Sequence, residues 1–460
     1  MMKYNFLLDT DSYKVSHWLQ YPPGTEGMFS YVESRGGRYP ATLFFGLQYI
    51  LKHDLAHPVE AWMVEEAKEF YTAHGEPFNE AGWNYIVREL GGKLPIRIRA
   101  VPEGTVVPVH NVLMTVESTD PQVFWLVSWL ETLLLRVWYP VTVATQSWYL
   151  RQAIYDALVR TADNPDGEIG FKLHDFGARG VSSCESSGIG GMAHLVSFSG
   201  SDTVQGVAYA NHYYHHPMAG FSIPAAEHST MTAWGRSREE AAYRNMLEQF
   251  AKPGSSVAVV SDSYDIWHAV ENLWGGSLRQ EVLDSGATVV IRPDSGNPAV
   301  VVSRILKILD DRFGSTTNSK GYKVLNAVRV IQGDGMNPET IVEVLEAIAK
   351  LGFSASNIAF GMGGALLQQV NRDTQKFAYK CSLVRIDGKD IPVLKDPATD
   401  PGKRSKPGRL DLVEHNGEFQ TIVLPVANPS RESQLETVYE NGKIVREYSL
   451  ERVRQRAGAR

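Results

Sequence analysis

Six short apolar runs between residues 170 and 370 each end abruptly in glycine or polar residues, and each is followed by a helical pattern. The six endings read HDFG (174–177), SGSD (199–202), SDSYD (261–265), RPDSG (292–296), QGDG (332–335) and GMGG (361–364). Strands that alternate with helices predict parallel pairing, because parallel neighbours need a crossover connection. Polar residues at the carboxyl ends of such strands form the binding sites of α/β barrels and open α/β sheets. We therefore expect an irregular parallel α/β barrel, and not a Rossmann sheet, since no Gly-x-Gly-x-x-Gly follows a first strand.

The segments on either side of this region indicate a second, β-rich lobe. Residues 94–117 alternate in polarity and are rich in β-branched residues, which is typical of strands. Helical patterns occupy residues 121–161, and Asn441-Gly442 between two alternating runs predicts a hairpin. The expected organisation is a β-rich and helical region at 1–160, the barrel core at 161–381, and a segment at 382–460 that returns to the β-rich lobe.

Composition excludes several classes of protein. Hydrophobic residues make up 43% of the 460 and charged residues 21%, as in an ordinary globular enzyme. A formal net charge of −7 argues against a nucleic-acid binder. Two cysteines are too few for a disulfide framework and favour a cytoplasmic setting, and the N-terminus lacks the apolar run of a signal peptide. The most apolar stretch, 123–144, contains Glu131 and Arg136, so we expect a buried helix and no membrane partner.

Three of the strand endings suit phosphate and sugar binding. Arg292 can hold a phosphate or carboxylate through its planar guanidinium, and Asp294 can accept from sugar hydroxyls, although the same pair could be a strand-end ion pair. The glycines of GMGG and QGDG would let backbone N–H groups approach an anion, with Asp334 placed for ribose hydroxyls. Each glycine-rich turn is weak support alone, and two after consecutive strands are stronger.

Other segments carry residues that could act on such a ligand or simply be structural. His228 follows Glu227 in AAEHS and could be a nucleophile or an acid–base group, with Asp262 and Asp265 as candidates to orient it. Phe176 could stack on a flat ring or close the core. The basic loop at 395–409 could serve phosphates or be a solvated surface loop, and the histidine-rich tract at 211–216 is read as surface.

Taken together, LDTDSYKVSHW, KLHDFGARG, PAAEHSTMTAWG, VVSDSYDI, IRPDSGNP, VIQGDG, IAFGMGG and DPGKRSKPGR resemble the nicotinamide phosphoribosyltransferase family over nearly the whole chain. The resemblance implies a type II phosphoribosyltransferase that acts as a homodimer with sites at the interface. It implies transfer of the phosphoribosyl group of 5-phosphoribosyl-1-pyrophosphate to nicotinamide, with Mg²⁺ as cofactor. ATP as a co-substrate would improve catalysis through a phosphorylated histidine.

The same resemblance assigns roles to individual residues. His228 would be the phosphorylated histidine, with Glu227, Asp265 and Asp294 as further catalytic residues. Phe176 and the partner subunit's Tyr13 would sandwich the pyridine ring, and Asp202 would accept from the nicotinamide amide. The remaining substrate contacts implied are Arg35, Arg179, Ser222, Ile223, Ala225, Ser261, Arg292, Gly333, Asp334, Asn357, Gly363, Gly364, Arg372, Lys380 and Lys395. No metal ligand is assigned.

Three alternatives stay open at this stage. A nicotinate phosphoribosyltransferase of related architecture would differ at the amide acceptor, because a carboxylate at Asp202 repels the anionic nicotinic acid. A sugar-phosphate aldolase would need a Schiff-base lysine at a strand end, and none of the six endings supplies one. A non-catalytic binding protein would have little use for His228 together with Arg292 and Asp294.

Overall fold

The computed structural model describes residues 4–399, 404–425 and 433–459, so the basic loop predicted at 395–409 lies partly outside the described residues. The chain divides into two compact units. Unit 1 comprises Met1–Thr145, Tyr213–His215 and Asn371–Gly458, and unit 2 comprises Gln146–His212, His216–Val370 and Ala459–Arg460. The main divisions between the units fall after residues 145 and 370. The sequence analysis had expected boundaries after residues 160 and 381.

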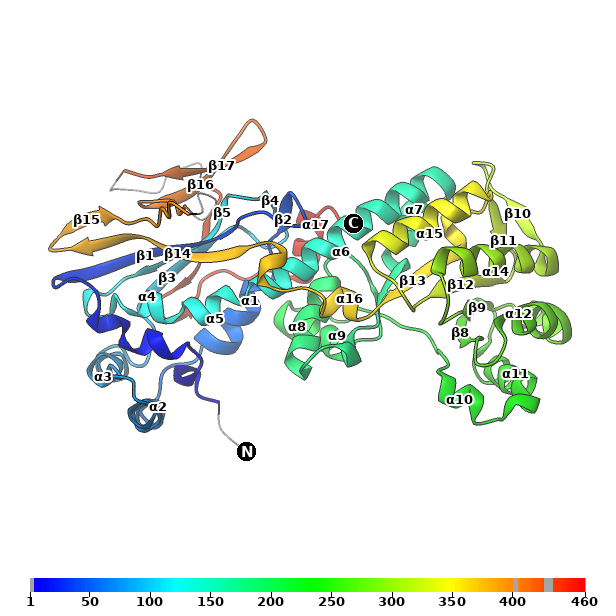
Figure 1. The fold of residues 1–460 in the computed structure, drawn as a ribbon, viewed down its shortest axis with the longest axis horizontal. Coiled ribbons are helices and arrows are strands. Elements are labelled where there is room, and N and C mark those ends of the chain that lie inside the picture. Colours follow the sequence, from blue (N-terminus) through cyan, green and yellow to red (C-terminus); the bar gives the residue numbers. More distant parts are fainter. Residues whose placement is uncertain (1–3, 400–403, 426–432, 460) are drawn as a thin grey trace. The chain divides into compact units, whose positions relative to one another are not determined.

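Unit 2 is built on the parallel sheet that the strand endings predict. Across the described residues this sheet has six strands in the order β7-β6-β13-β12-β9-β8, all of them parallel. Strands β13, β12, β9 and β8 of this sheet are labelled in Figure 1. Their bounds are β6 Leu173–Asp175, β7 Gly200–Ser201, β8 Ser256–Val260, β9 Thr288–Arg292, β12 Val328–Gln332 and β13 Ile358–Met362. Each strand corresponds to one of the six predicted endings, which confirms the parallel α/β architecture.

A single extended segment links the two edges of this sheet and makes the barrel irregular. Phe221 forms a parallel bridge with Gly200 on β7, and Ala225 forms one with Ala258 on β8. The Ala226 amide also donates to the Ala258 carbonyl at 2.9 Å, and the Ala258 amide donates to the Pro224 carbonyl at 2.9 Å. Residues 221–226 therefore satisfy backbone groups that an open sheet would leave unpaired at both edges.

Helices follow the strands of unit 2 and cover the sheet. They include α8 Cys184–His194, α9 Val204–Tyr213, α10 His228–Thr232, α11 Glu239–Phe250, α12 Ile266–His268 with the π-helix Ala269–Ser277, α13 Arg279–Ser285, α14 Pro298–Phe313, α15 Pro338–Lys350 and α16 Gly364–Leu367. Asn297 and Asn337 begin α14 and α15 as N-caps, each followed by a proline that suits the first helical position. Further elements are α7 Pro165–Glu168 and the hairpin of β10 Ser315–Thr317 and β11 Lys323–Leu325.

One predicted strand is much shorter than expected. The apolar run 195–198 does not join the sheet and instead follows α8, where Leu195 and Val196 are fully buried. The ring of Phe198 stacks on His194 with centroids 5.1 Å apart. The run thus packs α8 onto the sheet, and only Gly200 and Ser201 pair as β7.

Unit 1 contains an antiparallel sheet made from both ends of the chain. Its order within the described residues is β15-β14-β1-β5-β3-β18-β19. The strands are β1 Thr25–Ser34, β3 Ile96–Ala100, β5 Val112–Ser118, β14 Phe377–Ile386, β15 Lys389–Pro392, β18 Glu436–Glu440 and β19 Lys443–Ile444. Because β1 lies between β5 and the late strand β14, the predicted lobe from N-terminal and C-terminal segments is confirmed. The predicted hairpin joins β18 to β19, with Asn441 and Gly442 at φ values of 49° and 79°.

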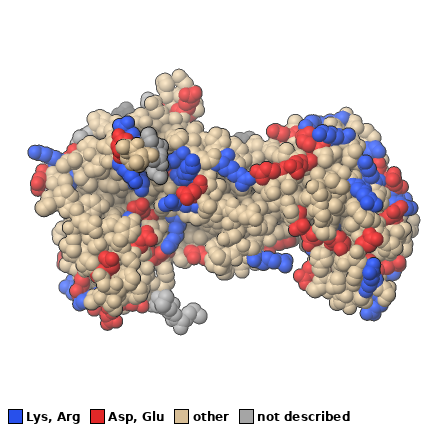
Figure 2. All heavy atoms as spheres, viewed as in Figure 1, with Lys and Arg blue, Asp and Glu red and all other residues tan. Residues whose placement is uncertain are grey.

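The other elements of unit 1 complete its core. They are β2 Ala41–Leu43, β4 Val106–Pro108, β16 Leu410–His415, β17 Glu418–Val423, α1 Leu47–Ile50, α2 Ala61–His74, α3 Glu80–Glu89, α4 Leu126–Trp129, α5 Glu131–Leu135 and α17 Leu450–Arg456; α6, Trp138–Thr161, runs from unit 1 into unit 2. Lysines and arginines are intermixed with acidic residues on the face shown in Figure 2, in keeping with the modest net charge. Within the described part of the chain, no helix has the length and apolar character needed to cross a membrane.

Candidate active site

A cavity of about 570 Å³ lies in unit 2 where the strand ends converge. Its walls come from the segments after β6, β7, β9, β12 and β13 and from the start of α10. The lining residues are Phe176, Ala178, Arg179, Asp202, Glu227, His228, Ser229, Arg292, Asp294, Gly333, Asp334 and Gly363. Ten of these twelve, all but Ala178 and Ser229, are residues that the sequence analysis assigned to the site.

His228 is held by a carboxylate from the neighbouring strand end. Its Nε2 donates to Oδ1 of Asp262, directly after β8, at 3.1 Å, and its Nδ1 lies 3.9 Å from Oδ2 of Asp294. The Asp262 side chain is 5% exposed, whereas that of His228 is 46% exposed. The buried carboxylate of Asp262 thus orients a solvent-accessible imidazole through Nε2, and the other ring nitrogen, Nδ1, can contact a ligand.

Asp262 also fixes the loop that follows β9. Its Oδ2 accepts hydrogen bonds from the Asp294 amide at 3.0 Å and from the Ser295 hydroxyl at 2.6 Å. Asp265, which the resemblance placed beside His228, instead begins α12, where Oδ1 accepts from the amides of Trp267 and His268 at 3.0 and 3.2 Å. The structure therefore gives Asp262 the orienting position and gives Asp265 the role of a helix cap. The SDSYD motif contained both candidates, but only the path of the turn decides between them.

Arg292 and Asp294 form the centre of the cavity. The Nη2 atom of Arg292 lies 4.0 Å from Oδ2 of Asp294, while its Nε is buried without a hydrogen-bond partner among the described residues. Because the Arg292 side chain lines the cavity, its terminal guanidinium nitrogens could donate charge-assisted hydrogen bonds to an anionic ligand. Burial raises the pKa of Asp294, and the charge of Asp262 acts in the same direction, while Arg292 opposes them.

Phe176 lies on a surface made of glycine backbone. A Cβ on Gly361 of β13 would come within 1.9 Å of the Phe176 ring, and one on Gly333 would lie 3.4 Å from it. The Phe176 amide donates to the Met362 carbonyl at 3.0 Å, which anchors the residue to β13. The absence of a side chain at Gly361 therefore makes room for the Phe176 ring. The glycine-rich motif alone did not reveal this role.

A second cavity of about 450 Å³ continues from the first along the inner face of the barrel, sharing Phe176, Asp202 and Arg292 with it. Ser222, Ile223 and Ala225, which the resemblance assigned to substrate binding, line it. The Ser222 hydroxyl donates to Oδ1 of Asp202 in a short hydrogen bond. This contact fixes the carboxylate beside the Phe176 ring.

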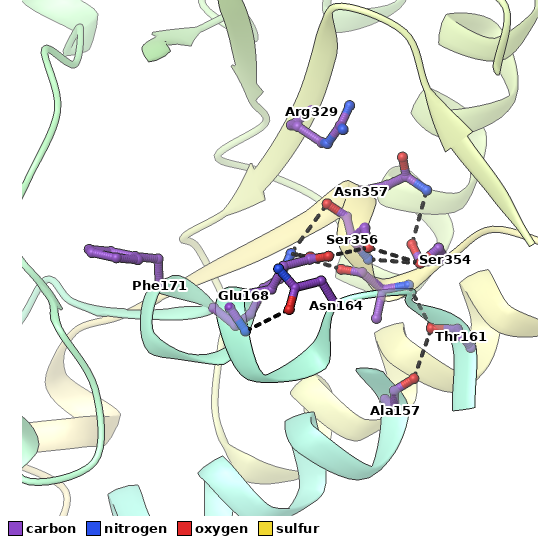
Figure 3. Close-up of polar contacts among 12 residues, drawn as sticks. Ala157, Thr161, Asn164, Glu168, Phe171, Arg329, Ser354, Ser356 and Asn357 are labelled. Atoms are coloured by element: carbon purple, nitrogen blue, oxygen red, sulfur yellow. Dashed lines mark hydrogen bonds and ion pairs between the residues drawn. The ribbon is translucent and has the colours of Figure 1, made fainter. Parts of the chain in front are cut away.

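The far end of the second cavity lies at the amino ends of the strands, and its polar surroundings are shown in Figure 3. Arg329 donates from Nη1 to the carbonyls of Leu325 and Val328. The Ser356 hydroxyl donates to Glu168 at 2.8 Å. Asn357, predicted to contact substrate, is fully buried here and donates to the Ser354 carbonyl at 2.9 Å. Its amide thus stabilises a turn and does not line either cavity.

Two further predicted contacts also lie away from the cavities. Ser261 is fully buried, donates to the Val259 carbonyl at 3.0 Å and accepts from the Trp274 indole at 3.0 Å. Gly364 begins α16 behind Gly363, and only Gly363 reaches the cavity wall. The burial of Ser261 and its filled hydrogen bonds make it a structural residue.

The remaining predicted residues belong to unit 1. Tyr13 is 58% exposed and is one of several exposed large hydrophobic residues in the described part of the chain. Arg372 is exposed and pairs with Asp373. Burial lowers the pKa of Lys380, and the positive charges of Arg35, Lys14 and Lys395 lower it further. Glu131 opposes this lowering, so Arg35, Lys380 and Lys395 lie in a region of this unit that contains both positive and negative charges.

An irregular parallel barrel whose strand ends present an aromatic ring, guanidinium groups and an oriented imidazole has the features of an α/β enzyme site suited to anionic ligands. Residues 171–443 match the sequence model of the nicotinate phosphoribosyltransferase family, and residues 5–98 match the nicotinamide phosphoribosyltransferase N-terminal domain. The chain belongs to this phosphoribosyltransferase family, on its nicotinamide phosphoribosyltransferase branch.

Full-length relatives support that assignment. A nicotinamide phosphoribosyltransferase of Xanthomonas campestris pv. campestris is 62% identical over 99% of this chain and 98% of its own. One from Acinetobacter baylyi is 30% identical, with 97% and 95% of the two chains covered. A structure of nicotinate-nucleotide pyrophosphorylase from Pyrococcus furiosus shares the fold, with a TM-score of 0.63 at 16% identity over 99% of this chain and 96% of that one. Human nicotinic acid phosphoribosyltransferase aligns with a TM-score of 0.56 at 17% identity, covering 98% and 93%.

Proposed function

We propose that this protein transfers the 5-phosphoribosyl group of 5-phosphoribosyl-1-pyrophosphate to nicotinamide, giving nicotinamide mononucleotide and pyrophosphate. The observation that carries the proposal is the placement of Phe176 and Asp202 beside Arg292 in two connected cavities. A flat ring with an amide would stack on Phe176 and donate to Asp202, while Arg179 and Arg292 would hold phosphate.

The chemistry requires positioning more than proton transfer. The ring nitrogen of nicotinamide supplies the electron pair for the new bond to the anomeric carbon, and pyrophosphate departs with the electrons of the broken C–O bond. The sugar carries positive charge in the transition state, so carboxylates near it, such as Asp294 and Asp334, would stabilise it and hold the ribose hydroxyls. No strong base is needed, which fits a cavity centred on arginine and aspartate.

Asp202 would select the base. Its carboxylate accepts from the Ser222 hydroxyl and keeps a second oxygen for the N–H donors of nicotinamide, whereas nicotinic acid would bring a second negative charge. Purified protein should form nicotinamide mononucleotide from nicotinamide and the activated ribose, with little product from nicotinic acid. Asp202→Asn should lower kcat/KM for nicotinamide by tenfold or more, since a charge-assisted hydrogen bond contributes about 1.5–3 kcal/mol. A preference of the wild type for nicotinic acid would overturn the proposal.

ATP would be coupled through His228. With Nε2 bound to Asp262, Nδ1 can attack the γ-phosphorus of ATP, forming an N–P bond as the P–O bond to ADP breaks. The Asp262 carboxylate would stabilise the positive ring, and hydrolysis of the phosphohistidine would return the free imidazole. γ-Labelled ATP should give acid-labile label that His228→Ala abolishes, and label that persists in that variant would refute this step.

Mg²⁺ would enter with the phosphates of the substrates. The described residues contain no group of three or more His, Cys, Asp or Glu side chains that could hold a metal ion by themselves. Mg²⁺ commonly binds through one or two carboxylates together with substrate phosphates. Asp294 and Asp334, both on the cavity wall, are the carboxylates suited to this. When bound, the ion would neutralise charge on the departing pyrophosphate.

A homodimer would complete the site with the partner subunit's Tyr13. The 58% exposure of the Tyr13 side chain supports this proposal. In a mixed dimer of the Tyr13→Ala and His228→Ala variants, one of the two sites would contain both an intact His228 and an intact Tyr13 from the other subunit. The mixture should therefore recover part of the ATP-coupled activity that each variant lacks alone. Absence of any recovery in a mixture shown to exchange subunits would refute a shared site.

A further inference from the structure

Asp175, the last residue of β6, lies beneath the predicted base site and is fully buried. It does not line either cavity, so it cannot touch a base directly. Neither the phosphate chemistry nor the base contacts proposed above use it. Its side chain is nevertheless a carboxyl group in a setting where an apolar residue would be the simpler choice.

The backbone and side chain of Asp175 join the two groups proposed to bind the base. Its Oδ1 accepts from the Gly177 amide at 2.7 Å and so holds the turn that carries Phe176. Its carbonyl accepts from the Asp202 amide at 2.9 Å, which fixes the start of the segment after β7. One residue therefore sets the position of both the stacking ring and the amide acceptor.

No positively charged group among the described residues acts on the carboxyl group of Asp175. Oδ2 has no hydrogen-bond partner among the described residues. A Cβ on Gly191 of α8 would lie 3.2 Å from Oδ2 and 3.0 Å from the methyl group of Thr203, which precedes α9. From β13, the strand neighbour is Met362. The charged group that acts on Asp175 is Asp202, after β7.

These surroundings favour a neutral carboxyl. Burial raises the pKa of Asp175 to about 7, and the negative charge of Asp202 acts in the same direction. The Gly177 amide and the Thr203 hydroxyl oppose this rise without cancelling it. The group therefore changes charge near neutral pH, while its position is fixed by the strand.

Building on the proposed function, we propose that Asp175 is a positioning residue whose neutral form holds Phe176 and Asp202 for nicotinamide and whose ionisation weakens nicotinamide binding. An ionised Asp175 would place a second negative charge behind Asp202, with only the Gly177 amide and the Thr203 hydroxyl to offset it. Relief of this charge requires the turn at Gly177 to move or to admit water, which displaces the Phe176 ring. Nicotinamide affinity would then depend on pH through a residue that never contacts the ligand.

The test is the pH dependence of KM for nicotinamide at saturating activated ribose. If only the neutral form binds, the wild-type KM should rise about 25-fold from pH 6.5 to 8.5, because the binding-competent fraction falls by that factor. Asp175→Asn keeps an oxygen acceptor for the Gly177 amide and stays neutral at every pH, so its KM should remain flat. Asp175→Ala removes that acceptor, and its KM should be high at every pH with a smaller change in kcat.

Glu239→Gln is the matched control, because Glu239 on α11 is another largely buried carboxyl whose pKa burial raises. This variant should keep the wild-type pH profile. A flat wild-type KM, or an Asp175→Asn profile equal to that of the wild type, would overturn the inference even if Asp175→Ala fails to fold. A wild type that uses nicotinic acid would refute the proposed function instead, and the pH profile for that base would still decide the role of Asp175.

Discussion

Replacement of Asp262 by alanine should show which of the two aspartates in the SDSYD motif, Asp262 or Asp265, orients His228. The variant removes the acceptor of the 3.1 Å hydrogen bond from His228 and the acceptor shared by the Asp294 amide and the Ser295 hydroxyl. The imidazole would lose both its orientation and the charge that stabilises its cationic form. We therefore expect the ATP-dependent stimulation to fall far more than the basal reaction.

The magnitude follows from the bond to His228. Hydrogen bonds to charged groups contribute about 1.5–3 kcal/mol, and each 1.36 kcal/mol in a barrier changes a rate about tenfold. The rate of His228 phosphorylation should therefore fall by roughly 10- to 150-fold. The loss of the two loop contacts should add a stability cost of about 1–3 kcal/mol, because the Asp262 side chain is 5% exposed.

Asp265→Ala supplies the matched control from the same turn. Asp265 caps α12, and loss of an N-cap costs about 0.5–2 kcal/mol in the free energy of unfolding. Its phosphorylation rate should stay near that of the wild type. Single-turnover measurement of acid-labile label from γ-labelled ATP, alongside urea unfolding, distinguishes the two variants. The reasoning is refuted if Asp265→Ala abolishes labelling while Asp262→Ala labels at the wild-type rate.

Three further changes test other parts of the structure. Gly361→Ala would place a Cβ 1.9 Å from the Phe176 ring and force the ring to move, at a cost of about 1–3 kcal/mol. The KM for nicotinamide should therefore rise roughly tenfold. An unchanged KM would contradict the proposal that Gly361 positions the Phe176 ring. The folded-state pKa of Asp175 is about 7 against an ordinary value of 3.8, so its neutral form stabilises the fold below pH 3.8 and that advantage is lost as pH rises through 7. The free energy of unfolding of the wild type should thus fall relative to Asp175→Asn over this range, by up to about 4 kcal/mol, in denaturant titrations at each pH. Tyr214→Phe removes a hydroxyl that donates to the buried carboxylate of Glu103, and the unfolding free energy should drop by about 1–3 kcal/mol; an unaltered urea midpoint would argue against this contact.

The positions of the strand endings could be predicted because parallel strands bring their carboxyl ends to one edge. Arg292, Asp294 and Asp334 follow apolar runs directly, so their convergence required only the strand assignment. Asn357, which the family resemblance placed among the substrate contacts, does not lie at such a strand ending. It is polar and precedes β13, but it lies at the opposite, amino end of that strand, where its amide satisfies buried backbone groups. A polar residue next to a strand therefore predicts a site residue only when it lies at the carboxyl end of that strand.

The choice between near neighbours depended on geometry that local sequence does not contain. Asp262 and Asp265 are three residues apart, and the direction of the turn after β8 sends one to His228 and the other to α12. Gly361 and Gly363 belong to one motif, yet one receives the Phe176 ring and the other lines the cavity. These assignments need the tertiary contacts of the neighbouring strands, which are distant in the sequence.

Two buried carboxyl groups, Asp262 and Asp175, organise two different parts of the site. Asp262 accepts three hydrogen bonds and ties β8 to the loop after β9 and to His228. Asp175 accepts one amide hydrogen bond at its side chain, which suits a neutral acid, and ties β6 to the segments that carry Phe176 and Asp202. Since the two groups share no hydrogen-bond partner, substitutions at Asp175 and Asp262 should affect base affinity and ATP coupling independently. A combined Asp175→Asn and Asp262→Ala variant should therefore show the flat nicotinamide KM of the first and the slow phosphorylation of the second, and a KM that regains its pH dependence in the double variant would show that the halves are coupled.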